Sequence, residues 1–249
     1  MSAPVSVTSR ALALLSAFDE HHRRLTLTEL ARRAGLPLAT AHRLAGELLE
    51  WGALERQAPG STYFVIGRRI WDLGLLAPVQ TGLRQVASPF LHDIYAATLA
   101  TVHLAVRDGD EVLYVDRLAG HQSVPVVSEI GSRLPLYSTG VGKVLLAHAP
   151  ADVQRRVLAD LRRITPYTIT QPGRIGAQLE RVRREGYAQT VEEMSLGGCS
   201  VAVPVRSRSG GPVEVVAALG MVVPSLKRDK PRMIAALQVA AEGISRSLR

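Results

Sequence analysis

Cys199 is the only cysteine among the 249 residues and stands in the stretch EEMSLGGCSVAVPV. Its thiol could serve as a nucleophile, as a redox sensor or as a small apolar group. A nucleophilic cysteine needs a histidine base and an orienting carboxylate or amide beside it in space. The seven histidines occupy positions that do not show which of them, if any, faces Cys199. Because Cys199 begins an apolar run typical of a strand, we favour a small side chain that lines a pocket.

Three other patterns could carry chemistry, and each is incomplete. The run YSTGVGKV is similar to a phosphate-binding loop, but such a loop needs glycine where Tyr137 stands and serine or threonine where Val144 stands. What remains is a helix N-terminus over 140–142, whose amides could hold a small carboxylate, or a turn that merely starts a helix. The histidines lack metal-ligand spacing, and adjacent Glu192 and Glu193 would point to opposite faces of a strand. We therefore expect no catalytic residue, no metal and no cofactor.

The first seventy residues predict a different kind of site. Helical spacing of apolar residues predicts a helix over 9–20, and the capping-box pair Thr26 and Glu29 begins a second, short helix. A third helix is predicted over 38–51, with small, polar and basic residues on its outer face. The segment ALERQAPGSTYFVIG then predicts two strands around a Pro-Gly turn. This order indicates a winged helix-turn-helix, and the alternative is an ordinary helical hairpin.

Composition agrees with a DNA-binding protein. The formal charge is +8 and the isoelectric point is near 10.2, which favours a polyanionic partner, although solvated Arg-rich helices would give the same excess. The longest apolar run, at 215–223, is far too short to span a bilayer, and the N-terminus lacks the pattern of a signal peptide. A single cysteine fits a reducing compartment. We therefore expect a cytoplasmic protein with no membrane partner.

Beyond the wing, the pattern predicts a linking helix and then an α+β domain. The linking segment is interrupted at Pro78 and Pro89, and its apolar residues face either a partner chain or their own domain. From Thr101 on, alternating segments predict an antiparallel sheet flanked by helices. The expected strands are TVHLAVRD, EVLYVDRLAG, SVPVVSEIG, YAQTVEEM, CSVAVPVRS and VEVVAALGMVV, and the expected helices cover 83–99, a segment after STG, 151–162, 174–186 and 227–248.

Taken together, these segments resemble the IclR family of bacterial transcriptional regulators over nearly the full length of the chain. The matching segments are SRALALLSAF, LTLTELARRAGLPLATAHRLAGELLEWGALER, DGDEVLYVDRLAG, IGSRLPLYSTGVGKVLLA, REGYAQTVEEMSLGGCSVAVPV and ALGMVVP. The resemblance implies a winged helix-turn-helix domain over 1–68, a linker helix over 69–82 and a GAF-like effector-binding domain over 83–249. It also implies a homodimer or homotetramer that represses or activates a nearby catabolic operon. We expect a repressor that binds a pseudo-palindromic operator in double-stranded DNA.

The resemblance implies two sets of site residues in this chain. The DNA-binding set is Thr26, Arg33, Pro37, Ala39, Thr40, His42, Arg43, Glu47 and Arg56. The effector-binding set is Leu134, Ser138, Thr139, Gly140, Val141, Gly142, Gln189, Glu193, Gly197, Cys199, Val201, Gly220 and Val222. The effector that the family implies is a small organic or aromatic acid.

The chain departs from the family pattern at positions that affect both sites. Leu38 and Ala39 stand where many relatives have lysine or serine, which removes a polar contact to DNA. Gly220 and Val222 stand where some organic-acid binders carry serines, and Gln189 replaces an acidic residue. These changes make the pocket less polar, so we expect a ligand larger or more apolar than glyoxylate.

Two other interpretations stay open at this point. In one, the chain is a small-molecule-processing enzyme with Cys199 as its nucleophile, and the helix-turn-helix serves oligomerisation. In the other, it is a DNA-binding protein whose sensor domain no longer binds a ligand.

Overall fold

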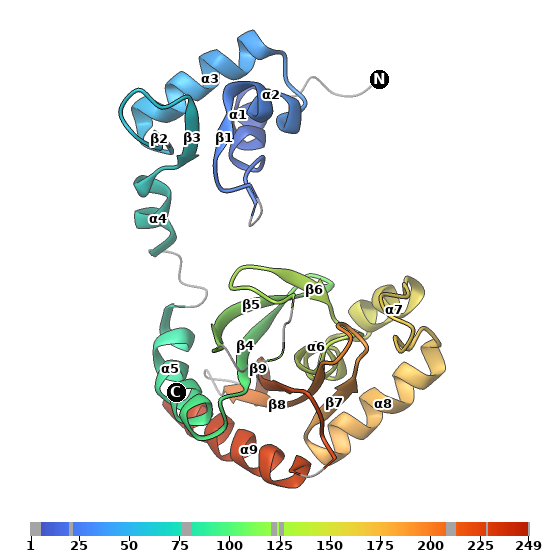
Figure 1. Cartoon of the computed structure of the whole chain (residues 1–249). Coiled ribbons are helices and arrows are strands. Elements are labelled where there is room, and N and C mark those ends of the chain that lie inside the picture. Colours follow the sequence, from blue (N-terminus) through green and yellow to red (C-terminus); the bar gives the residue numbers. More distant parts are fainter. Residues whose placement is uncertain are drawn as a thin grey trace. The chain divides into compact units, whose positions relative to one another are not determined.

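The computed structural model describes residues 6–19, 22–75, 81–120, 124, 127–207, 213–227 and 229–248. The chain divides after Pro78 into two units, and each is described by itself (Figure 1). The predicted interruption at Pro78 lies in the stretch 76–80, outside the described residues, and the predicted end of the linker helix at residue 82 falls within the helix that begins at Thr81.

The N-terminal unit is a three-helix bundle with a small sheet against it. Its three strands are antiparallel and run in the order β1-β3-β2. The elements are α1 Val7–Leu15, β1 Leu25–Thr26, α2 Leu27–Ala34, α3 Leu38–Trp51, β2 Leu54–Arg56, β3 Tyr63–Ile66 and, after the sheet, α4 Arg68–Leu75. The predicted winged helix-turn-helix is confirmed.

Local sequence signals account for where α2 and α3 begin and end. The capping box is present: Thr26 Oγ1 accepts from the amide of Glu29, and the Thr26 amide donates to Glu29 Oε2 at 2.8 Å. Gly35 ends α2 with a φ of +65°, a conformation that costs glycine little. Buried Leu14, Leu30, Leu44 and Phe64 share the core of the unit. The turn between α2 and α3 is therefore fixed by packing on both sides.

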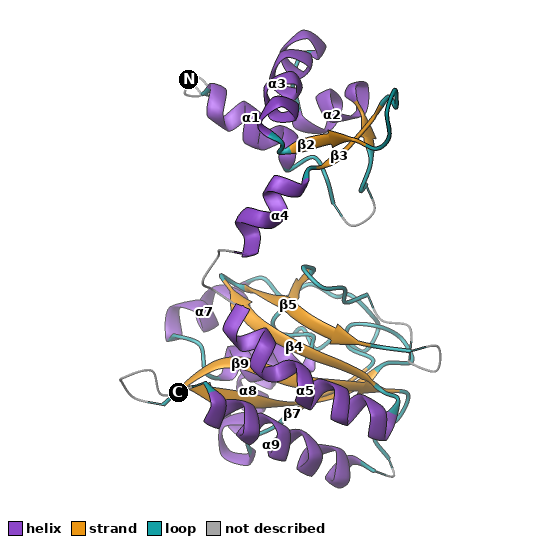
Figure 2. Cartoon of the chain, turned by 90° about the vertical axis from the view of Figure 1, so that its left-hand side faces the viewer, coloured by secondary structure: helices purple, strands orange, loops and turns teal. Residues whose placement is uncertain are grey.

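The C-terminal unit is built on one six-stranded antiparallel sheet in the order β6-β5-β4-β9-β8-β7 (Figure 2). Its strands are β4 Thr101–Asp108, β5 Glu111–Leu118, β6 Arg133–Pro135, β7 Ala188–Val191, β8 Cys199–Ser207 and β9 Glu214–Val223. Every pair of neighbouring strands is antiparallel, as predicted.

Helices cover both faces of this sheet. One face packs against α5 Thr81–Thr98 and α9 Lys230–Ser247, with Leu91, Val203 and Leu237 in the core between them. The other face packs against α6 Gly140–Ala147, α7 Ala151–Ala159 and α8 Pro172–Glu185. The predicted α+β class is confirmed. None of the helices in the described ranges has the length and apolar character needed to cross a membrane.

Two predicted elements differ from the structure. SVPVVSEIG was expected to be a strand, but its described residues form none; residues 128–132 are a turn in which the Glu129 amide donates to Ser132 Oγ and Gly131 takes a φ of +88°. The sheet edge is instead the short β6. Pro89 was expected to interrupt a helix, yet α5 continues through it. Burial of Ala87 and Leu91 against the sheet offsets the roughly 3 kcal/mol that an internal proline costs.

Candidate functional site

The outer face of α3 is the first candidate site. Ala41, Leu44 and Ala45 are buried against the bundle, so the helix turns the opposite face outward. Ala39, His42, Arg43 and Glu47 are exposed on that face, Thr40 is half-buried, and Pro37 is exposed just before the helix begins. This is the arrangement in which the second helix of a helix-turn-helix presents side chains to a major groove.

Arg43 and Glu47 form an ion pair on this face. Arg43 Nη1 lies 2.5 Å from Glu47 Oε1, one helical turn away, and both side chains are 58% exposed. An exposed pair of this kind contributes at most about 1 kcal/mol, so DNA can displace it. The ion pair with Glu47 therefore orients the Arg43 side chain only weakly.

Three of the predicted DNA contacts also hold the unit together. Thr26 caps α2, as described above. Arg33 donates from Nε to the carbonyl of Ala17 at 2.6 Å and pairs with Asp19. Arg56 donates to two carbonyls of the wing, and its guanidinium lies 3.9 Å from the centre of the Phe64 ring. These intramolecular contacts hold the three side chains in place within the N-terminal unit.

The second candidate site is a cavity on the face of the sheet that packs against α6. Its empty space, including the opening, is about 480 Å³. Among the predicted effector residues, it is lined by Leu134, Thr139, Gly140, Val141, Val201, Gly220 and Val222. Sequence reasoning missed the other lining residues, which are His103, Tyr114, Val127, Ser128, Thr190, Met194, Ser195, Gly198, Ser200 and Met221.

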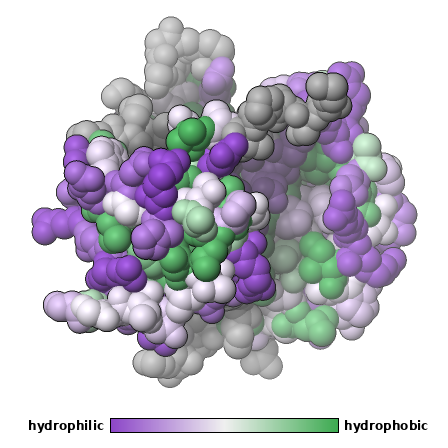
Figure 3. Space-filling model, turned by 90° about the horizontal axis from the view of Figure 1, so that it is seen from above, coloured by the Kyte–Doolittle hydropathy of each residue, from purple (hydrophilic) through white to green (hydrophobic). Residues whose placement is uncertain are grey.

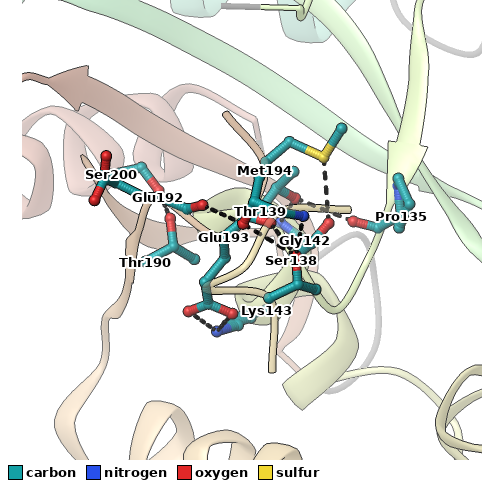
Figure 4. A network of polar contacts seen from close by, with 12 residues as sticks. Pro135, Ser138, Thr139, Gly142, Lys143, Thr190, Glu192, Glu193, Met194 and Ser200 are labelled. Carbon is teal, nitrogen blue, oxygen red and sulfur yellow. Dashed lines mark hydrogen bonds and ion pairs between the residues drawn. The ribbon is translucent and has the colours of Figure 1, made fainter. Parts of the chain in front are cut away.

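The N-terminus of α6 forms one wall of the cavity. Thr139 caps the helix, because its Oγ1 accepts from the amide of Gly142 at 3.1 Å (Figure 4). The amide of Gly142 is thereby occupied, whereas those of Gly140 and Val141 belong to a first turn without helical acceptors. A Cβ at Gly140 would lie 2.5 Å from Ser200 Oγ, so only glycine lets α6 approach β8 this closely.

The polar side chains of the lining are uncharged. Thr190 and Ser200 share a hydroxyl hydrogen bond of 2.6 Å, and Ser128 Oγ lies 2.8 Å from His103 Nε2. Burial, reinforced by the charge of Arg117, lowers the pKa of His103 from its ordinary 6.5 to about 3. Burial also raises the pKa of Tyr114, whose ring meets that of His103 edge-on at 5.0 Å. At neutral pH the described lining therefore carries no formal charge.

Glu193, predicted in the effector site, is not part of the lining. Its carboxylate accepts from Lys143 Nζ at 2.6 and 2.7 Å, and both side chains are at least 95% buried (Figure 4). Burial lowers the pKa of Lys143 and raises that of Glu193, while their mutual attraction opposes both shifts. The loop that Glu193 begins is also anchored by Thr168, whose hydroxyl donates to the Glu193 carbonyl.

Cys199 also lies outside the cavity. Side chains alternate along β8, and since Ser200 faces the cavity, Cys199 faces the core formed with α5 and α9. Its Sγ donates to the carbonyl of Pro224 at 3.7 Å, and burial raises the pKa of the thiol. A reactive cysteine needs a lowered pKa. This environment is that of a small core side chain.

The remaining predicted effector residues, Ser138, Gln189 and Gly197, do not line the cavity. The Ser138 hydroxyl donates to Met194 Sδ at 3.3 Å, and Gln189 accepts from Lys230 Nζ at 3.2 Å on the opposite side of β7 from Thr190. Gly197 takes a φ of +74° in the turn before Gly198, which does line the cavity. The loop of residues 192–198 thus lines the cavity through Met194, Ser195 and Gly198, and the family pattern located the loop but not which of its residues line the cavity.

Burial of neutral His103 predicts a pH-dependent stability. Its folded pKa lies below its unfolded value, so its contribution is complete above about pH 6.5 and is lost as the pH falls toward 3. Between about pH 7.5 and about pH 5.5, the wild-type chain should lose about 1.4 kcal/mol more unfolding free energy than a His103→Gln variant. Urea unfolding at both pH values measures this difference, and equal losses would show that His103 is protonated in the folded chain.

Comparison with known proteins identifies the family models and the relatives that this chain matches. Two family models match: the IclR helix-turn-helix domain over residues 7–58 and the bacterial transcriptional regulator IclR C-terminal domain over residues 77–246. The chain is 30% identical to the HTH-type transcriptional regulator KdgR of Escherichia coli, over 97% of this chain and 93% of that protein. It is 32% identical to the p-hydroxybenzoate hydroxylase transcriptional activator of Acinetobacter baylyi, over 81% and 76% of the two chains.

A solved structure is similar along the whole chain. It is the crystal structure of an IclR homolog from Microbacterium hydrocarbonoxydans complexed with 4-hydroxybenzoate. The TM-score is 0.91 with 33% sequence identity, and the match covers 98% of this chain and 99% of that one.

Proposed function

The chain belongs to the IclR family of helix-turn-helix transcriptional regulators with an effector-binding C-terminal domain, and from this premise we propose that it represses a neighbouring operon until a small aromatic acid binds in the cavity beside α6. The observation that carries the proposal is that the chain combines an exposed helix-turn-helix face with a cavity whose described lining is uncharged. The relatives named above are regulators, and Cys199 is buried with a raised thiol pKa. We therefore propose no catalytic role, and we place the protein with its DNA in the cytoplasm.

On the DNA side, exposed residues of α3 contact the bases. The residues that hold the N-terminal unit together fix the position of α3 on the DNA. Arg43, His42, Thr40 and Ala39 approach the major groove, and Pro37 sets the start of the helix. Thr26, Arg33 and Arg56 hold the bundle and the wing against the phosphate backbone, which fixes register without reading sequence. Glu47 keeps Arg43 oriented when DNA is absent.

On the effector side, the lining favours an aromatic acid over a small hydrophilic one. Gly220, Val222 and Val141 give the cavity an apolar surface, and the amides of Gly140 and Val141 with the Thr139 cap offer a place for a carboxylate. The bound 4-hydroxybenzoate of the Microbacterium homolog supports the same class of ligand here. Binding shifts DNA affinity because the ligand prefers one of the conformations that the chain samples.

Exposed apolar side chains in the N-terminal unit support a homodimer. Trp71 is 63% exposed and Leu73 47% exposed on α4, and Val7 and Leu12 are exposed on α1. Seen from above, the surface shows hydrophobic residues among hydrophilic ones (Figure 3). A second copy covering such side chains would place two α3 helices for a pseudo-palindromic operator. Pairing of dimers would give the tetramer.

Filling the cavity should abolish effector binding without harming the fold. Val222 is half-buried in the lining, and Val222→Phe places a ring in the space that the ligand needs. We expect 4-hydroxybenzoate to bind this variant at least about 100-fold more weakly than it binds wild type, whereas Val222→Ala should change the affinity by about tenfold or less. Isothermal titration calorimetry measures both, and tight binding to Val222→Phe would place the ligand elsewhere.

A further inference from the structure

Polar side chains of the effector cavity lie on both sides of strand β9. Thr190 and Ser200 sit on β7 and β8, whereas His103 sits on β4, with β9 between them. In register, His103 lies opposite Gly220 and Ser200 lies opposite Val222. Two strand spacings separate β4 from β8, which is about 10 Å. Strand β9 therefore lies between a Thr190–Ser200 end and a His103 end of the cavity, and Tyr114, whose ring meets that of His103, also lines the cavity.

The His103 end has unused hydrogen-bonding capacity. A neutral imidazole offers one donor and one acceptor nitrogen. Nε2 lies 2.8 Å from Ser128 Oγ, whereas Nδ1 makes no hydrogen bond with any residue that the structure describes. The side chain is 3% exposed and lines the cavity. Because Nδ1 has no partner among the described residues, a ligand atom in the cavity that pairs with it would gain a hydrogen bond.

Two neighbours of His103 each carry a buried polar atom that the described residues leave without a hydrogen-bond partner. Thr101 lies two residues earlier on β4, on the same face, and Arg117 lies opposite His103 on β5. Thr101 Oγ1 and Arg117 Nε are buried and have no hydrogen-bond partner within the described part of the chain. Neither Thr101 nor Arg117 lines the cavity, so His103 is the one of the three residues that a ligand in the cavity would contact.

We propose that the effector carries a second, uncharged hydrogen-bonding group, a hydroxyl on the aromatic ring opposite its carboxylate, and that His103 is the residue that selects for it. This inference rests on the proposed function, since it concerns the same cavity. A hydroxyl both donates and accepts, so it suits His103 in either tautomer. A second carboxylate would need a cation here, but His103 stays neutral and the Arg117 guanidinium does not line the cavity. Ser128 orients the imidazole and is a positioning residue.

The test compares three acids on the full-length protein by isothermal titration calorimetry. The probes are 4-hydroxybenzoate, benzoate and terephthalate, which share a ring and one carboxylate. Wild type should bind 4-hydroxybenzoate at least about tenfold more tightly than either of the others, because the unsatisfied site rejects a ligand without the hydroxyl. His103→Phe should keep its affinity for benzoate and lose the preference. Thr190→Val, at the other end, should weaken all three acids alike.

Each other outcome has a distinct meaning. If benzoate and 4-hydroxybenzoate bind wild type equally, or if His103→Phe keeps the preference, the role of His103 is wrong while the aromatic-acid cavity stands. A preference for terephthalate overturns the uncharged character of the second group. If no aromatic acid binds, the proposed effector class itself fails. Ser128→Ala, which removes only a hydroxyl, serves if His103→Phe does not fold, and it should reduce the preference about threefold or more.

Discussion

Replacing Lys143 by methionine is expected to lower the free energy of unfolding by about 3–5 kcal/mol, because it leaves the Glu193 carboxylate buried without its partner. Urea unfolding followed by circular dichroism measures the loss. Burial already raises the pKa of Glu193, and removal of the ammonium raises it further. The protonated carboxyl tolerates burial, so the loss should be smaller near pH 5 than near pH 8.

Two controls separate the buried charge from a change of packing. A Lys143→Met, Glu193→Leu double variant should regain most of the lost stability, since no charge is left in the core. Arg156→Met removes an arginine that is 53% exposed and pairs with Asp110 and Asp152, so it should cost at most about 1 kcal/mol. If Lys143→Met and Arg156→Met prove equally mild, the buried pair does not anchor the loop of residues 192–198.

The second large effect concerns DNA. Arg43→Ala should weaken binding to the operator by about 1–3 kcal/mol, or roughly 5- to 150-fold, and relax base preference where Arg43 contacts DNA. The effector affinity should be unchanged, because α3 belongs to the N-terminal unit and the cavity to the other. Fluorescence anisotropy with labelled operator and with scrambled DNA measures affinity and preference together.

Matched variants test the assignment of Arg43. Arg155→Ala removes an arginine of α7 that is also exposed and should leave operator affinity nearly unchanged. Glu47→Gln removes the negative partner of Arg43 and should tighten binding to both DNAs. Unchanged operator affinity in Arg43→Ala would contradict the role of the α3 face.

Sequence reasoning was most accurate where structure depends on neighbouring residues. The capping box at Thr26, the left-handed Gly35 and the helical spacing of α3 are local signals, and the winged helix-turn-helix followed from them. The antiparallel sheet followed from period-two patterns in the same way. Pro89 shows the limit, because tertiary packing keeps α5 continuous there.

The effector site was located as a region but not side chain by side chain. Which face of β8 meets α6 depends on the close approach of Gly140 to Ser200, and this turns Cys199 to the other core. Glu193 forms a buried ion pair with Lys143, fifty residues away in the chain. His103 faces the cavity because it pairs with Gly220 of β9, which also lines the cavity. Such pairings between distant segments leave no mark in a local pattern.

The central claim is that an aromatic acid in the cavity beside α6 controls DNA binding. The most direct test is a gel-shift titration on the intergenic DNA beside this gene, with and without saturating 4-hydroxybenzoate, using wild type and Val222→Phe. We predict that the acid changes the affinity of wild type for this DNA by at least about tenfold and leaves Val222→Phe unaffected. The same affinity with and without the acid, in a wild-type protein shown to bind it, would contradict the account.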